Sequence, residues 1–156
     1  AQYRAVSNSN SFQLGIGFTD IGLLVNGGFS RAFSTNIRGT FAGSFSTANY
    51  NDIQYYGIYM DGIIGYTMFS PRGSKFMVNA QGGISFVYDK ISEFQRSDDS
   101  PVKSSLNTGI IGGLEAEFIM NKLVSVFISS NLRYYIKDDF GRVRNHSLIG
   151  FRYIIR

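Results

Sequence analysis

The sequence predicts an all-β protein, an eight-stranded antiparallel up-and-down transmembrane β-barrel that forms a single domain over residues 1–156. Three observations support this prediction. Apolar and polar residues alternate in eight segments of about ten residues each, the connections between these segments follow a short–long pattern, and the composition suits strands. Gly is abundant at 18 and aromatic residues reach 15%, whereas Pro is limited to 2, which disfavours helices and disorder alike.

The eight alternating segments are 11–18, 22–33, 37–48, 53–68, 75–88, 105–119, 123–136 and 146–156. The third is the clearest, with Ile37, Gly39, Phe41, Gly43 and Phe45 on one face and Arg38, Thr40, Ala42, Ser44 and Ser46 on the other. Successive side chains of a strand point to opposite faces, so this pattern predicts an apolar outer wall and a polar interior. The mean hydropathy of −0.03 is close to zero, as expected when an apolar face and a polar face contribute about equally.

The connections between the segments indicate the orientation of the barrel. Three of them are short turns at 34–36, 70–74 and 120–122, whereas longer, charged loops are expected at 89–104 and 137–145. The first two connections on the side of these longer loops, after the first and the third segments, are short. Outer-membrane barrels have short periplasmic turns and longer extracellular loops, so both termini are expected in the periplasm, with 1–10 as a periplasmic extension.

Aromatic residues of the predicted outer face gather near the strand ends, as expected for girdles at the two membrane–water interfaces. The periplasmic girdle would contain Phe12, Phe33, Tyr66, Phe76, Phe118 and Tyr153. The extracellular girdle would contain Phe18, Phe45, Tyr56, Phe86, Tyr88 and Tyr134.

The same features predict the compartment and the partners. The chain has no Cys, contains no apolar run long enough for a transmembrane helix, and starts at Ala1 rather than Met, which fits export with a cleaved signal peptide. We therefore expect the outer membrane of a Gram-negative bacterium, with its lipids and lipopolysaccharide as neighbours. The basic residues are scattered singly, so no nucleic-acid partner is expected, and no motif indicates a cofactor or a metal.

Charged residues fall on the predicted inner face of several segments. They are Arg38, Asp61, Glu115, Glu117, Arg133 and Arg152. An eight-stranded barrel is just wide enough for its side chains to fill, and buried charges must be paired. We therefore expect these residues to form structural ion pairs that leave no continuous pore.

No catalytic constellation is evident, so the protein is predicted not to be an enzyme. The only histidine, His146, lies beside Ser147, but neighbouring strand residues face opposite ways and cannot form a catalytic dyad. Two alternatives remain open, a barrel enzyme and a soluble lipocalin-like carrier. The carrier would require the opposite polarity, with an apolar interior.

Two blocks of the sequence resemble the TraO-type conjugative-transposon proteins of Bacteroides-type bacteria. They are residues 117–156, EFIMNKLVSVFISSNLRYYIKDDFGRVRNHSLIGFRYIIR, and residues 75–90, KFMVNAQGGISFVYDK. Together they cover roughly a third of the chain, and a looser similarity extends over 11–69. The resemblance implies a small outer-membrane barrel, similar to the OmpA and OmpX types, that serves as an accessory part of a conjugation machine.

The expected function is therefore that of an accessory or anchoring subunit of a larger outer-membrane assembly, in contact with other outer-membrane protein subunits. A stand-alone structural or adhesive barrel of the OmpX type is the alternative. Two surfaces are candidates for partner contact. One is the outward glycines Gly27, Gly39 and Gly43, which would let another chain approach closely, and the other is the predicted loop around Ile91 and Phe94.

Overall fold

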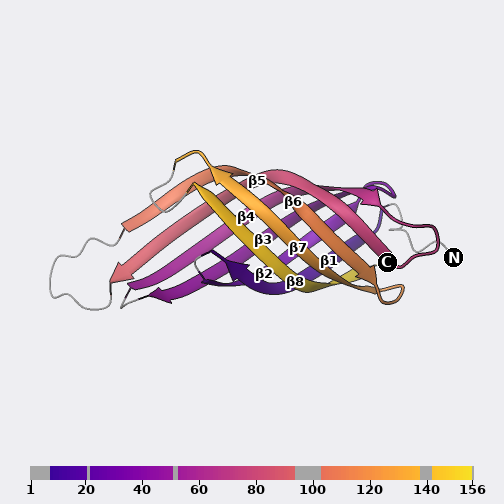
Figure 1. Cartoon of the computed structure of the whole chain (residues 1–156), viewed down its shortest axis with the longest axis horizontal. Coiled ribbons are helices and arrows are strands. Elements are labelled where there is room, and N and C mark those ends of the chain that lie inside the picture. The colour runs from indigo at the N-terminus through magenta and orange to yellow at the C-terminus, as the bar shows by residue number, and fades with distance from the viewer. Residues whose placement is uncertain (1–7, 21, 51–52, 94–102, 138–141, 156) are drawn as a thin grey trace.

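The computed structural model describes residues 8–20, 22–50, 53–93, 103–137 and 142–155, which fold into one closed antiparallel β-barrel (Figure 1). The strands are β1 (Asn10–Thr19), β2 (Gly22–Ala32), β3 (Ile37–Tyr50), β4 (Ile53–Phe69), β5 (Phe76–Glu93), β6 (Lys103–Ile119), β7 (Val124–Tyr135) and β8 (Val143–Ile155). The described residues contain no helix long and apolar enough to cross a membrane. The predicted fold class is confirmed.

Each strand pairs with the next in the chain, and β1 closes the barrel against β8. Because Asn10 pairs with Ile155, β1 begins and β8 ends at the same end of the barrel, which we call the termini end. The β2–β3, β4–β5 and β6–β7 turns lie at this end as well. The opposite end, which we call the loop end, carries the other four connections.

The two faces of the barrel wall differ sharply in polarity. Outward side chains are apolar and exposed, as Leu14 at 70% and Ile110 at 62% illustrate, whereas inward Arg133 and Glu117 are almost completely buried. A soluble carrier needs the reverse arrangement, with an apolar cavity inside a polar surface. The lipocalin-like alternative is therefore wrong for this chain.

The predicted girdle residues are exposed on the outer face, except for Tyr56, which is half-buried. At the termini end, Phe12 lies opposite Phe29 and Tyr153, and the Phe12 and Phe29 rings make an edge-to-face contact at 5.5 Å. At the loop end, the rings of Phe45 and Tyr56 are 6.1 Å apart. Aromatic bands at two levels are the arrangement that interfacial anchoring requires.

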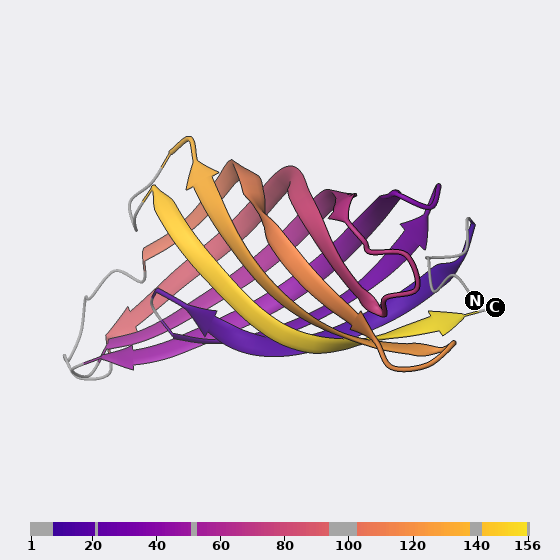
Figure 2. The same cartoon turned by 45° about the vertical axis from the view of Figure 1, so that its right-hand side comes forward.

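The barrel wall is not equally tall on all sides (Figure 2). At the loop end, the pairing of β2 with β3 stops at Leu23 and Thr47, whereas Ala48–Tyr50 of β3 continue to pair with β4. On the other side, Lys103–Asn107 of β6 pair with β5 beyond Gly109, the residue that pairs with Tyr135 at the loop end of β7. The loop-end parts of β3–β6 therefore extend past their neighbours, and we call them the projecting sheet.

The structure corrects three predicted boundaries. Residues 89–104 were expected to form a loop, but β5 continues to Glu93 and β6 starts at Lys103. Residues 137–145 were also expected to be a loop, but β8 starts at Val143. The charges of Asp89 and Arg144 argued for loops, yet both side chains face inward and neutralise each other. Likewise β1 starts at Asn10, within the predicted N-terminal extension.

Two inward glycines leave room for the tip of an aromatic ring against the wall. Gly15 of β1 is paired with Gly150 of β8, and the Cζ atom of Phe127 lies close to both. A Cβ atom at Gly150 would lie 2.7 Å from that ring and would also collide with the backbone of Leu14. Arg152 also stacks on Phe127, with its guanidinium carbon 4.9 Å from the ring centre. The missing side chains thus help to position the charged groups of the lumen.

Candidate functional site

The lumen near the termini end holds a cluster of two arginines and two glutamates. Arg152 of β8 donates hydrogen bonds to Glu117 Oε2 at 2.7 Å and to Glu115 Oε2 at 3.0 Å. Arg38 of β3 donates to Glu117 Oε2 at 2.7 Å, and its Nη1 lies 3.6 Å from Glu115 Oε1. The two glutamates are alternate residues of β6, so the pairs link β3, β6 and β8 across the barrel.

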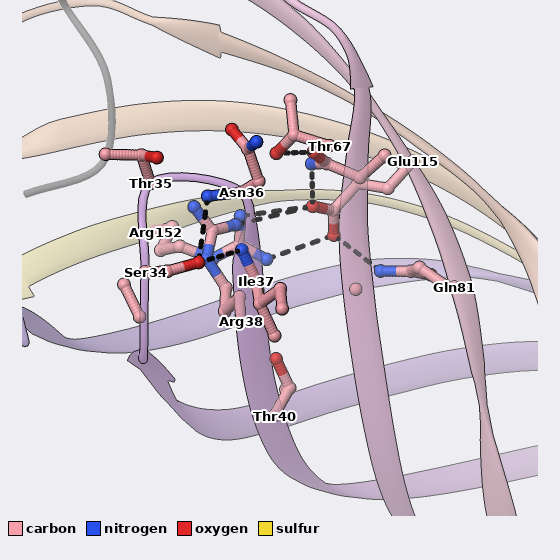
Figure 3. Close-up of a pocket in the computed structure, with 13 residues that line it drawn as sticks. Ser34, Thr35, Asn36, Ile37, Arg38, Thr40, Thr67, Gln81, Glu115 and Arg152 are labelled. Atoms are coloured by element: carbon pink, nitrogen blue, oxygen red, sulfur yellow. Dashed lines mark hydrogen bonds and ion pairs between the residues drawn. The ribbon is translucent and has the colours of Figure 1, made fainter. Parts of the chain in front are cut away.

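Neutral polar side chains satisfy the remaining oxygens of this cluster. Gln81 and Asn79 donate to Glu115 at 3.0 and 3.1 Å, and Ser125 donates to Glu117 at 2.5 Å. Figure 3 shows how Arg38, Glu115, Arg152 and Gln81 converge beneath the 34–37 turn. The cavity between them measures about 20 Å³, which is room for about one water molecule and too little for a substrate.

A second ion pair lies further along the lumen, between Asp61 of β4 and Arg133 of β7. Arg133 Nη2 donates to Asp61 Oδ2 at 2.6 Å, and each side chain is only 1% exposed. Ser85 donates to the other oxygen of Asp61 at 2.6 Å, and the hydroxyls of Ser85 and Tyr135 are 3.1 Å apart. Such a fully buried pair is stable only when both charges are compensated.

A third pair, between Asp89 and Arg144, closes the lumen at the loop end and was not anticipated from the sequence. Two nitrogens of Arg144 donate to the two carboxylate oxygens of Asp89 at 2.9 and 2.7 Å, a bidentate arrangement. Tyr55 donates to Asp89, and the Tyr55 and Tyr59 hydroxyls accept hydrogen bonds from Arg144. Continuing the period-two alternation from the outward Tyr88 to Asp89, and from the inward His146 back to Arg144, places both charged side chains inside the barrel.

The structure thus gathers all six predicted interior residues into ion pairs and adds two more. Four arginines and four carboxylates are paired in the described lumen, so their formal charges sum to zero. The three groups lie across the barrel at successive levels, from β3, β6 and β8 at one end to β5 and β8 at the other.

This arrangement predicts a lumen that does not conduct ions freely. The purified protein in planar bilayers should give no large, steady single-channel conductance, because an ion would have to displace several compensated pairs. Steady openings of a uniform size, which persist after further purification, would show instead that the lumen contains an open path.

His146 is fully buried between the second and third pairs. Its ring packs edge-on against Tyr59 at 4.6 Å, and neither ring nitrogen has a hydrogen-bond partner among the described residues. Ser147 points the other way and is exposed, as expected from the alternation, so the two residues form no catalytic dyad. In addition, no three potential metal-ligating His, Cys, Asp or Glu residues gather within the described parts of the chain.

We expect His146→Leu to be tolerated, because replacing a polar group that makes no hydrogen bond by an apolar one of similar size removes a desolvation cost. The free energy of unfolding in urea should fall by no more than about 1 kcal/mol, or should rise. A loss of several kcal/mol would indicate that the imidazole has a hydrogen-bond partner and a specific role.

The predicted partner residues occupy different settings. Gly27 and Gly43 are directly paired on the outer face and leave a shallow gap, whereas the Phe33 ring covers Gly39. Ile91 belongs to β5 rather than to a loop, and it shares the inner face with Asp89. Phe94 lies outside the described residues. Among the described residues, the pair Gly27 and Gly43 is an outward surface of the expected kind.

Comparison with known proteins gives a structural likeness only. No family model matches the chain, and no curated protein matches it either.

Among solved structures, the N-terminal β-barrel domain of Pseudomonas aeruginosa OprF matches with a TM-score of 0.72 at 11% identity, covering 96% of this chain and 98% of that one. Ail, the attachment invasion locus protein of Yersinia pestis, matches with a TM-score of 0.63 at 14% identity, over 96% and 100% of the chains. The outer membrane enzyme PagL matches with a TM-score of 0.55 at 14% identity, over 91% and 97%. These similarities establish that the chain has the fold of small outer-membrane β-barrels.

Proposed function

We propose that the protein is a non-enzymatic outer-membrane barrel that acts as an accessory or anchoring subunit of a larger outer-membrane assembly. The observation that carries this proposal is the lumen, in which the described charges form compensated ion pairs and the cavity beneath the 34–37 turn, at about 20 Å³, is too small for a substrate. A barrel of this kind acts through its outer wall and its two ends. Conjugative transfer is the process we favour, because of the resemblance of residues 75–90 and 117–156 to TraO-type proteins.

The absence of enzymatic activity is part of the proposal. The same fold is found in an outer membrane enzyme, so the fold alone does not decide the matter. What supports a non-catalytic role is the position of His146, which is buried away from Ser147 and from any surface that a substrate could reach.

Crosslinking in the native membrane, followed by mass spectrometry, tests the subunit role. We expect crosslinked species that contain other outer-membrane proteins, and we expect them to weaken when Gly27 and Gly43 are replaced by Leu, which would fill the gap on the outer face. Gly112→Leu is the matched control, because that glycine is also open and lies on a different side of the barrel. A protein recovered only as a free monomer would contradict the proposal.

A stand-alone adhesive role is the second candidate, and the projecting sheet favours it. Ser104–Asn107 of β6 are paired with β5 on one side only within the described residues, so their other edge is available for an added strand. The solved structure of Ail, an attachment protein, shares this fold. Whole cells that express the protein should then bind host surfaces, and Leu106→Pro should weaken this binding without unfolding the barrel.

A further inference from the structure

The charges of this chain are distributed unequally along the barrel. The sequence has 15 basic and 11 acidic residues, which gives a net charge of +4. The lumen contributes nothing to this excess, because its four arginines and four carboxylates cancel. The excess positive charge must therefore lie at the ends of the barrel.

The termini end carries positive charge. Its described residues include no acidic side chain outside the lumen but several basic ones, and three of these are exposed: Arg31, Arg72 and Lys122, which we call the basic rim. Apart from the four lumen carboxylates, the acids of the sequence all fall in or beside the segments that connect strands at the loop end: Asp20, Asp52, Glu93, Asp98, Asp99, Asp138 and Asp139. Among the described residues, an acidic side chain outside the lumen, such as Asp20, therefore occurs only beside the connections of the loop end.

The cations of the basic rim lie at the edge of the apolar wall. Arg31 is exposed on the outer face of β2 between Phe29 and Phe33, which are 39% and 57% exposed. Lys122 lies in the β6–β7 turn between the exposed Met120 and Leu123. A long basic side chain with apolar neighbours extends its charge toward the polar layer of a membrane.

Arg72 is held at the tip of the β4–β5 turn by the backbone. The Ser74 amide donates to the Pro71 carbonyl at 3.0 Å, and Gly73 has a φ of 77°, so Arg72 occupies the first corner of a tight turn. The exposed side chains of Phe69 and Phe76 lie on either side of this turn. The basic rim is therefore formed by three separate turns or strand ends around the barrel.

We propose that the basic rim binds the phosphate groups of anionic phospholipids in the membrane leaflet at the termini end. Three features support this: the described residues at this level include no acidic side chain outside the lumen, the cations border exposed apolar side chains, and they are spread around the circumference. A lipid supplies both the phosphate and the acyl chains that such a border requires. The proposal rests on the transmembrane role proposed above.

Native mass spectrometry tests this proposal on the full chain in non-ionic detergent, titrated with equal amounts of phosphatidylglycerol and phosphatidylcholine of the same acyl chains. Wild-type protein should bind phosphatidylglycerol in preference. The variant Arg31→Gln/Arg72→Gln/Lys122→Gln should lose this preference, by about fivefold for each cation removed. The matched control Lys90→Gln/Lys137→Gln/Arg142→Gln removes three exposed cations from the loop end and should retain it.

Equal binding of the two lipids to wild-type protein, or an equal loss of preference in both triple variants, would overturn the proposal. Wild-type protein that shows no lipid preference, but loses native crosslinks when the basic rim is neutralised, would identify an acidic protein as the partner and would also overturn it. If the rim variant fails to fold, the wild-type preference should still fall steeply at high salt, and a salt-independent preference would contradict us. In a separate refolding experiment, protein that inserts neither into phosphatidylglycerol vesicles nor into phosphatidylcholine vesicles would instead refute the transmembrane role itself.

Discussion

Asp61→Ala is expected to lower the free energy of unfolding by about 3–5 kcal/mol, because it breaks a fully buried ion pair on one side only. The substitution leaves the guanidinium of Arg133 buried without its carboxylate, in a position where only 1% of the side chain is exposed. The measurement is urea unfolding of the refolded barrel in phospholipid vesicles, followed by the gel mobility of the unheated protein.

Two further variants separate the cost of an orphaned charge from the value of the pair. Asp61→Leu combined with Arg133→Leu removes both charges and should recover most of the lost stability. Asp20→Asn, at the exposed loop end, should change the unfolding free energy by less than about 1 kcal/mol. A double variant that is no more stable than Asp61→Ala would contradict the ion-pair explanation.

Leu14→Lys is expected to cost about 2–4 kcal/mol in vesicles, because it places a charge on the lipid-facing wall between the two aromatic girdles. Leu14 lies on β1 between Phe12 and Phe18 and is 70% exposed. In a soluble protein, a lysine at such an exposed position would cost almost nothing. The same unfolding measurement in vesicles therefore distinguishes a lipid-facing wall from a wall in water.

Ile136→Lys provides the matched control for this prediction. Ile136 is 74% exposed, similar to Leu14, but it lies just past the loop end of β7. A lysine near the interface should cost only about 0–1 kcal/mol. Equal costs at the two positions, or no cost at either, would show that the apolar wall does not lie in the membrane as we describe.

Much of the fold is predictable because alternation over many residues determines which side chains face inward. The strands from Gly22 to Phe69 agree with the predicted segments to within two residues at each end, and the inward positions of Asp61 and Arg133 follow directly. Pairing of opposite charges is also predictable, since a small barrel has no other way to bury them. The partner of each charge depends on the register across the lumen, which no single strand reveals.

The sequence is least informative where charges occur inside strands. Asp89 and Arg144 resemble loop residues because charged residues are rare in buried strands, and only their mutual contact makes the inward positions acceptable. For the same reason, the end of β5 in the projecting sheet is not predicted, because the alternation is interrupted by a charged residue at Asp89. A charged residue can continue a strand when an opposite charge faces inward from another strand, as Arg144 does for Asp89.

Spin-label accessibility along β7 is the decisive measurement for a membrane-spanning barrel with an apolar outer wall and an ion-paired interior. The chain has no native Cys, so single cysteines introduced from Val126 to Leu132 can be labelled without background. Outward labels at positions 126, 128, 130 and 132 should meet oxygen dissolved in the bilayer and be shielded from a water-soluble nickel complex. Inward labels at 127, 129 and 131 should be shielded from both. We therefore expect the accessibility to oxygen to alternate with a period of two residues. A uniform profile, or exposure of the outward positions to the nickel complex, would contradict the account.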